Sequence, residues 1–209
     1  MILLSEAEMT EAFLRWQKQN PSPVSELEYK NPYTLLIAVV LSAQATDKSV
    51  NKATKALFEK VTSPQQMLNL GYDKLLPYIK SIGLYKNKGA NIIKLSKMLV
   101  EEYNSEVPST KEELVKLPGV GPKTANVVLN VIFKQPTMPV DTHILRIAPK
   151  IGLAPGSTPE EVEKGLLKRI PAEFLFNAHH WILLHGRYVC TAKNPKCNEC
   201  LIADLCKHN

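Results

Sequence analysis

Hydrophobic residues recur every three or four positions along most of the chain, which is the spacing of one face of an α-helix. The first such segment carries a polar pair, Ser5 and Glu8, spaced as a capping box, and Asn20 and Pro21 end it. Its apolar face consists of Met9, Ala12, Phe13 and Trp16. The pattern therefore predicts an amphipathic helix near the start of the chain.

Small polar residues ahead of apolar runs mark further helix starts. These residues are Asn31, Thr46, Ser63, Asp73, Ser109 and Thr158, together with Asp141 or Thr142. Residues 35–41 are apolar without a period and could form a buried strand or a buried helix. Asn31 as a cap, Pro32 at the first helical position and the lack of a partner strand favour the helix. Because no clear strand or hairpin signal occurs, we predict an all-α fold.

Several helix ends are predicted by the same patterns. The helix that opens at Asp73 is expected to end at Gly83, and the next carries apolar residues up to Tyr103. Long helices are expected over about 122–133 and over 172–189.

The segment 117–125 joins two of the predicted helices through a Gly-Val-Gly turn. Gly119 and Gly121 flank Val120, and Pro122 pre-sets the first turn of the second helix. Such a turn points backbone N–H groups and the positive end of the helix dipole at one place, where an oxyanion fits. The segment matches neither the P-loop nor the dinucleotide fingerprint, because both need glycines where it has other residues.

Lys123 lies in the first turn of the helix that follows these glycines. The positive end of the helix dipole there favours the neutral amine, which is the nucleophilic form. An ordinary turn between helices with a solvated lysine fits the same residues equally well. The segment thus predicts either an anion site with an amine nucleophile or a plain connection.

All four cysteines lie within the last twenty residues of the chain. They are Cys190, Cys197, Cys200 and Cys206. This concentration favours metal binding over disulfides. Only Cys197 and Cys200 form a Cys-x2-Cys pair, whereas zinc usually takes two such pairs, so zinc and an iron–sulfur cluster both stay open. Lys193 and Lys196, between the first two cysteines, belong to a solvated loop or contact a phosphate backbone.

Asp141 precedes a predicted helix, where its ordinary role is that of an N-cap. A carboxylate can serve as a cap and a catalytic group together. One helix and a return loop separate Lys123 from Asp141. The two side chains could therefore meet if that helix packs back on the Gly-Val-Gly turn.

Four of the five histidines stay unassigned, because their spacing fits no metal-binding motif. They are His143, His179, His180 and His185. A histidine beside Trp181 on an apolar helix is more often a core residue than a ligand.

Composition and charge narrow the class of protein. A chain of 209 residues with 44% hydrophobic residues can fold as one domain or two small ones. Its net charge of +6 and pI near 9.0 fit a polyanionic partner without proving one. Because no leader pattern and no run of about 18 apolar residues occurs, we expect a cytoplasmic protein without a membrane partner.

Three motifs together resemble the endonuclease III family of helix-hairpin-helix DNA glycosylases. They are residues 117–125, residues 139–144, and the cysteine pattern Cys-x6-Cys-x2-Cys-x5-Cys from 190 to 206. Residues 41–47 and 82–85 are also similar to that family, and the match runs from about Asn31 to Cys206. One departure is Pro149, which suggests that the helix after Asp141 ends early.

The resemblance implies a two-lobed fold with the active-site cleft between the lobes. One lobe is a six-helix barrel at 24–135 that contains the helix-hairpin-helix. The other is a discontinuous helical domain of 1–23 plus 136–209. It holds a [4Fe-4S] cluster in the loop 190–206, with the four cysteines as metal ligands.

The resemblance also implies a bifunctional DNA glycosylase and AP lyase of base excision repair. Lys123 would attack the sugar of an oxidised pyrimidine nucleotide, Asp141 would assist, and β-elimination would cut the strand 3′ to the abasic site. The expected partner is double-stranded DNA with damaged bases or abasic sites, bound by a monomer. Expected DNA-binding residues are Gln44 and Leu84 as wedges, with Gly119, Val120, Gly121, Lys193 and Lys196.

Two other functions compete with this one. An adenine-mismatch or other monofunctional glycosylase would share the hairpin, the aspartate and the cluster, but usually lacks the lysine that stands here at Lys123. A non-catalytic DNA-binding module with a zinc-stabilised tail is the alternative from another class.

Overall fold

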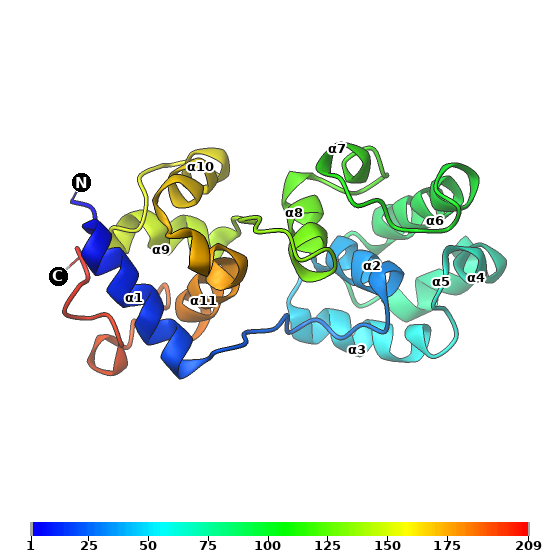
Figure 1. The fold of residues 1–209 in the computed structure, drawn as a ribbon. Helices are drawn as coiled ribbons and strands as arrows, with labels where there is room; N and C mark the ends of the chain where they lie inside the picture. Colours follow the sequence, from blue (N-terminus) through cyan, green and yellow to red (C-terminus); the bar gives the residue numbers. More distant parts are fainter. Residues whose placement is uncertain (1, 209) are drawn as a thin grey trace. The chain divides into compact units, whose positions relative to one another are not determined.

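A computed structural model describes residues 2–208, and every regular element within them is helical (Figure 1). The predicted all-α fold is therefore confirmed for this part of the chain. The chain divides into two compact units. Residues 25–133 form the first, here called the hairpin unit, and the described residues before and after them form the second, the cysteine unit.

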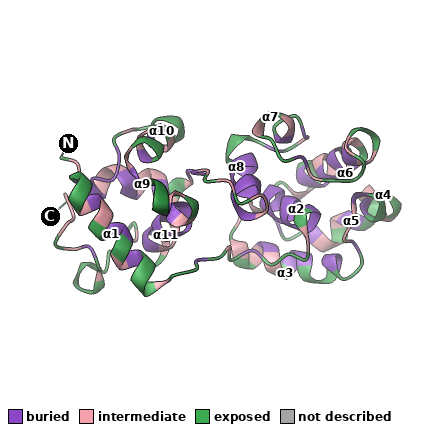
Figure 2. Ribbon diagram, in the orientation of Figure 1, coloured by how far each residue is buried: buried purple, intermediate pink, exposed green. Residues whose placement is uncertain are grey.

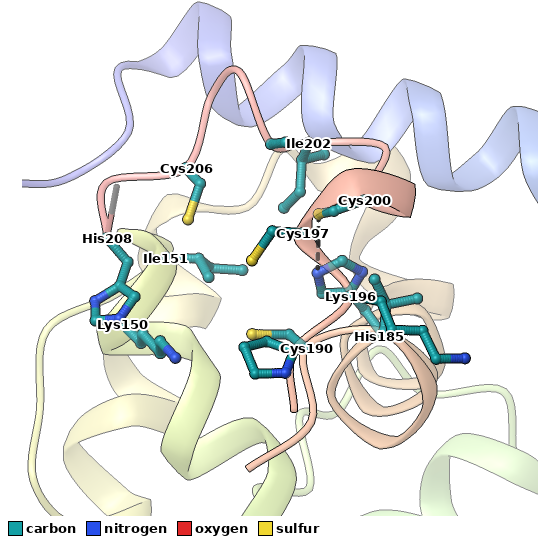
Figure 3. Close-up of a pocket in the computed structure, with 13 residues that line it drawn as sticks. Lys150, Ile151, His185, Cys190, Lys196, Cys197, Cys200, Ile202, Cys206 and His208 are labelled. Carbon is teal, nitrogen blue, oxygen red and sulfur yellow. Dashed lines mark hydrogen bonds between the residues drawn. The ribbon is translucent and has the colours of Figure 1, made fainter. Parts of the chain in front are cut away.

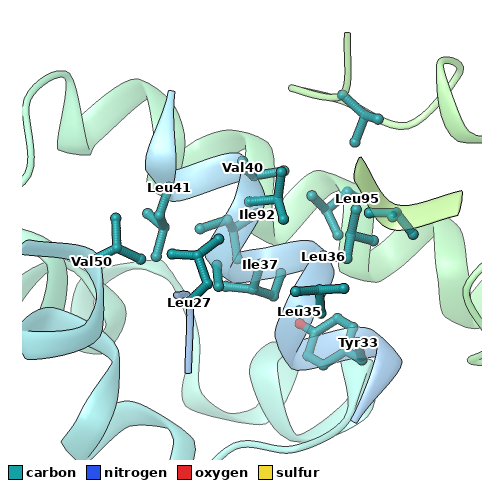
Figure 4. Close-up of a cluster of buried hydrophobic side chains, with 14 of the residues drawn as sticks. Leu27, Tyr33, Leu35, Leu36, Ile37, Val40, Leu41, Val50, Ile92 and Leu95 are labelled. Carbon is teal, nitrogen blue, oxygen red and sulfur yellow. The ribbon is translucent and has the colours of Figure 1, made fainter. Parts of the chain in front are cut away.

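The hairpin unit contains seven of the described helices. They are α2 (Pro32–Ser42), α3 (Asp47–Phe58), α4 (Pro64–Leu70), α5 (Tyr72–Ile79), α6 (Tyr85–Glu102), α7 (Lys111–Leu114) and α8 (Pro122–Val131). Every residue of α2 from Tyr33 to Leu41 is buried, and α3, α6 and α8 pack around it. Figure 4 shows its side chains facing those of α6, among them Ile92 and Leu95. Because α2 is covered on all sides, its sequence needs no polar face, which explains the apolar run without a period.

The cysteine unit is built from both ends of the chain. It contains α1 (Glu6–Gln19), α9 (Thr142–Ile151), α10 (Pro159–Arg169), the short 3-10 helices η1 (Ala172–Phe174) and η2 (Cys197–Glu199), and α11 (Leu175–Tyr188). Phe13 of α1 stacks on Phe174, with their ring centroids 5.5 Å apart, and lies 6.2 Å from the ring of Trp181 on α11. Figure 2 shows buried residues along α1, α9 and α11, and these residues belong to one hydrophobic core. The predicted apolar face of the first helix is therefore the face through which α1 packs against the C-terminal part of the chain.

Most predicted helix caps are confirmed, and two are wrong. Thr110, not Ser109, caps α7 by accepting a hydrogen bond from the Glu113 N–H. The helix α5 begins at Tyr72 and not at Asp73, because Gly71, at φ 78°, reverses the chain and leaves no room for a separate cap.

Three further helix boundaries also differ from the prediction. The helix α5 ends at Ile79 and not at Gly83, and the segment predicted as one helix over 172–189 begins as η1. The helix α9 does not end early at Pro149 but runs to Ile151. It stops where Gly152 takes a left-handed conformation, a common helix end, while the proline is tolerated in the last turn.

Candidate functional site

The turn between α7 and α8 is fixed by glycine geometry and by buried neighbours. Gly119 has φ 82°, and a Cβ built there would lie 3.0 Å from the Cβ of Asn91, so both backbone and space favour glycine. The Val120 N–H donates to the Leu117 carbonyl at 3.0 Å, and both side chains are buried. Gly121 is the N-cap of α8 and offers no side chain to its first N–H groups. The start of α8 therefore keeps backbone donors that can meet an anion.

Lys123 occupies the first turn of α8 and is exposed, whereas residues 124–131 are buried. The Lys123 amine is therefore exposed to solvent, while the rest of α8 after it is packed in the core. Because the side chain is exposed, the protein alone does not strip water from the amine.

Asp141 is the N-cap of α9 and is half-buried. One carboxylate oxygen, Oδ1, caps the helix by accepting a hydrogen bond from the Ile144 N–H at 2.8 Å. This bond does not use the other carboxylate oxygen, Oδ2. Lys123 belongs to the hairpin unit and Asp141 to the cysteine unit.

Gln44 and Leu84 share an unusual backbone conformation. Their φ angles are 56° and 58°, in the left-handed region, which costs a non-glycine residue roughly 1–2 kcal/mol. Gln44 follows the end of α2, and Leu84 precedes the first residue of α6. Both side chains are exposed, and Leu84 keeps 62% of its surface accessible. Leu84 is therefore not a core leucine, and both residues present their side chains on short strained turns of the hairpin unit.

Lys88 is a candidate residue that no sequence motif indicated, and its ammonium is buried in the hairpin unit, with 7% of the residue exposed. Its Nζ donates to the Leu41 carbonyl at 3.0 Å and to the Ala43 carbonyl at 2.6 Å. Burial lowers the pKa of this lysine. The sequence does contain a sign of this burial, because Lys88 lies at helical spacing from the apolar residues Ile92 and Leu95 and so falls on the buried face of α6.

The four cysteines gather around one cavity of the cysteine unit (Figure 3). Cys190 comes two residues after α11, Cys197 begins η2, and the other two follow it in the chain. All four are free thiols, so the structure contains no disulfide among them. Lys150 and His208 also line the cavity, and burial raises the pKa of the Cys190 and Cys200 thiols.

The donor set around this cavity fits a multi-iron cluster. Four free thiols line a single space, yet within residues 2–208 no three Cys, His, Asp or Glu side chains stand close enough to bind one ion. A four-iron cluster takes one thiolate at each iron, so its ligands stand apart around a larger object. The thiols would lose their protons on binding, as cysteine ligands must.

The loop that carries these cysteines is fastened to α1. The Arg15 guanidinium donates to both carboxylate oxygens of Asp204, at 2.6 and 3.0 Å, and to the Leu201 carbonyl at 2.8 Å. Lys207 donates to Glu8 at 2.6 Å, and this contact with the Lys207 ammonium holds the pKa of Glu8 at about 2. The N-terminal helix therefore holds the loop at two points.

Two further residues support the base of the loop. Arg146 of α9 donates from one nitrogen to the carbonyls of Gly186 and Cys190, both at 2.7 Å. The Nε2 of His185 lies 3.8 Å from the Cys200 sulfur, as the dashed line in Figure 3 marks. In contrast, Lys193 and Lys196 are exposed on the loop.

The histidines of α11 are core residues. His179, His180 and His185 are buried, and burial lowers the pKa of His180 and His185 to about 4. The positive charge of Lys134 adds to the shift at His180. Both imidazoles are therefore neutral near pH 7.

Comparison with known proteins places the chain among DNA repair proteins. Residues 37–172 match the family model "HhH-GPD superfamily base excision DNA repair protein". Residues 190–206 match the iron-sulfur binding domain of endonuclease III. Within the described residues, no helix is long and apolar enough to span a membrane.

Individual relatives are similar over nearly their whole length. The chain is 57% identical to endonuclease III of Rickettsia felis, covering 92% of this chain and 91% of that protein. It is 51% identical to endonuclease III of Escherichia coli strain K12, covering 98% and 97%. A solved trapped endonuclease III–DNA covalent intermediate matches with a TM-score of 0.91 and 45% identity, covering 99% of this chain and 97% of that chain. A thermostable thymine-DNA glycosylase, at 21% identity and a TM-score of 0.81, shares the fold.

Proposed function

The chain belongs to the endonuclease III family, and from this we propose that Lys123 and Asp141 carry out its glycosylase and lyase chemistry on damaged DNA. Its function is that of a bifunctional DNA glycosylase and AP lyase of base excision repair. The observation that carries the proposal is the exposed amine of Lys123 in the first turn of α8, beside N–H groups that no side chain caps. A phosphate held by those groups would place the DNA backbone next to the amine.

The reaction begins with the Lys123 amine as the nucleophile. Its nitrogen lone pair forms a bond to the sugar C1′, the bond to the base breaks, and the base leaves with that electron pair and takes up a proton. The sugar ring then opens as the C1′–O4′ bond breaks and O4′ takes up a proton, which leaves a Schiff base between C1′ and Nζ. The iminium acidifies the C2′ proton, and its removal expels the 3′ phosphate by β-elimination. One amine therefore serves both activities.

Asp141 assists by holding or moving a proton with the oxygen that does not cap α9. The Ile144 N–H fixes the carboxylate through Oδ1 and so limits its rotation. A carboxylate fixed in this way is suited to hold or accept a proton during the reaction.

The chain carries a [4Fe-4S] cluster. We propose Cys190, Cys197, Cys200 and Cys206 as its ligands, because their free thiols line one cavity. When bound, the cluster would cross-link four points of a loop that contains only one short 3-10 helix, and so hold that loop in one conformation.

DNA binding follows from the family, and its contact residues are proposals. The turn of Gly119, Val120 and Gly121 would bind one phosphate through its backbone, and Lys193 and Lys196 would bind others. Gln44 and Leu84 would enter the duplex where the damaged nucleotide leaves it, since their turns already present them to solvent. We further propose that oxidised pyrimidines are the preferred lesions and that the protein acts as a monomer.

The substrate proposal is tested with four duplexes of one sequence. They carry thymine glycol, uracil, adenine opposite 8-oxoguanine, or an abasic site. We expect base release and strand cleavage at thymine glycol and cleavage at the abasic site, with the other two duplexes left intact. Release of adenine opposite 8-oxoguanine without strand cleavage would instead indicate a monofunctional enzyme, and binding without any turnover would indicate a non-catalytic module.

Replacing Lys193 and Lys196 by alanine is expected to weaken binding to all DNA sequences alike. Each lost phosphate contact should flatten the slope of log K against log salt by about 0.9. Filter binding across a salt series measures this slope, with Lys164→Ala and Lys168→Ala, two exposed lysines of α10, as the charge-matched control. A slope equal to that of the unchanged protein would remove both lysines from the interface.

A further inference from the structure

The buried ammonium of Lys88 bonds to backbone carbonyls at the end of α2. The Leu41 carbonyl lies in the last turn of that helix and the Ala43 carbonyl just beyond it, where intrahelical bonds no longer supply donors. A cation is also favoured at the negative end of a helix dipole. Lys88 therefore completes the C-terminal end of α2 from a different helix, α6.

The same residue is bonded to the turn that begins α6. Its backbone N–H donates to the Leu84 carbonyl at 3.0 Å, the first such bond in that helix. Ala43, held by the side chain, immediately precedes Gln44. One residue thus contacts both short turns that present Gln44 and Leu84.

The backbone beneath Lys88 is itself closely packed. A Cβ at the next residue, Gly89, would lie 3.0 Å from Leu76 of α5, so α6 and α5 approach closely at this level. The side chain of Lys88 therefore extends from a tightly packed part of the α6 backbone. The Leu41 carbonyl that accepts one of these bonds is itself buried, so the ammonium must be buried to reach it. Burial removes water from the charge, and the two bonds to carbonyl groups offset this cost.

We propose that Lys88 is a positioning residue that fixes the turns of Gln44 and Leu84 relative to each other, so that both side chains enter the DNA duplex together. The inference rests on the proposed insertion of these two residues. Left-handed conformations at non-glycine residues persist only where the surroundings enforce them, and Lys88 is bonded at both turns.

The test compares Lys88→Met with Lys88→Arg. Methionine keeps an unbranched apolar side chain without the charge and donors, whereas arginine keeps both. Single-turnover cleavage is measured at saturating DNA with an abasic site in a duplex and in the same strand alone. We expect Lys88→Met to slow duplex cleavage by about tenfold or more but single-strand cleavage by less than about twofold, because a single strand needs no insertion. Lys88→Arg should recover most of the duplex rate.

A double-mutant cycle separates positioning from capping. In a Gln44→Ala, Leu84→Ala background, Lys88→Met should slow duplex cleavage by less than a further twofold or so, since no inserting side chains are left to position. An equal loss on both DNA forms, or the full tenfold loss in this background, would reduce Lys88 to a cap of α2 and overturn the inference.

The outcomes also distinguish this inference from the proposed function. Full duplex activity of the Gln44→Ala, Leu84→Ala variant would refute insertion, and the inference with it, while the role of Lys123 would stand. Should Lys88→Met not fold, Lys88→Arg decides instead, measured both alone and in the Gln44→Ala, Leu84→Ala background. An arginine variant that loses duplex and single-strand rates equally contradicts positioning.

Discussion

Replacing Lys123 by glutamine is expected to abolish base release, strand cleavage and borohydride trapping. Glutamine has similar length but no nucleophilic amine, so neither the bond to C1′ nor the Schiff base can form. The loss should be at least about 10⁴-fold, the scale seen when a covalent nucleophile is removed. Single-turnover cleavage of duplexes with thymine glycol and with an abasic site measures it.

DNA binding should survive this substitution. Lys123 is one exposed charge beside a turn whose phosphate donors are backbone groups, so affinity for a duplex with an uncleavable abasic analogue should change by no more than about threefold. Lys116→Gln is the matched control, because it removes an exposed lysine that precedes the same turn. It should cleave normally. Cleavage by Lys123→Gln at the unchanged rate would rule out the proposed nucleophile.

Replacing Asp141 by asparagine is expected to lower the cleavage rate at least about 10²-fold without unfolding the protein. Asparagine can still cap α9 by accepting the Ile144 N–H, but it cannot take up a proton as the carboxylate does. Thermal unfolding followed by circular dichroism, beside single-turnover cleavage, separates the two properties.

Two further variants at this position separate the cap from the chemistry. Asp141→Ser should keep the cap and lose activity as Asp141→Asn does. Asp141→Ala should lose activity and also about 1 kcal/mol of stability, because the Ile144 N–H loses its partner. If asparagine or serine supported normal turnover, Asp141 would be a structural cap alone.

The fold could be predicted because capping residues in the sequence mark where most of its helices begin. Asn31 and Pro32 define the start of α2 whatever surrounds it, and the cap at Ser5 does the same for α1. Errors arose where neighbouring residues offer the same chemistry. Ser109 and Thr110 are adjacent hydroxyls, and only the path of the chain into α7 decides between them.

Local patterns could not reveal contacts between distant segments. The pairing of Arg15 with Asp204 joins residues at opposite ends of the sequence, and the residues around each of them give no sign of this contact. The contact of Lys88 with Leu41 and Ala43 likewise depends on how α6 packs on α2. Motifs could identify Lys123 and the cysteines as chemical candidates, but the residues that hold such groups in place emerge only from tertiary packing.

As the proposed nucleophile, Lys123 forms a covalent bond with the DNA sugar during the reaction. Borohydride reduction during turnover on a thymine glycol duplex should trap a protein–DNA adduct, because it reduces the Schiff base to a stable amine. Proteolysis and mass spectrometry of that adduct then locate the cross-link. We expect the cross-link on the peptide that contains Lys123. A cross-link on any other lysine, or no adduct despite strand cleavage, would contradict the assignment of Lys123 as the nucleophile.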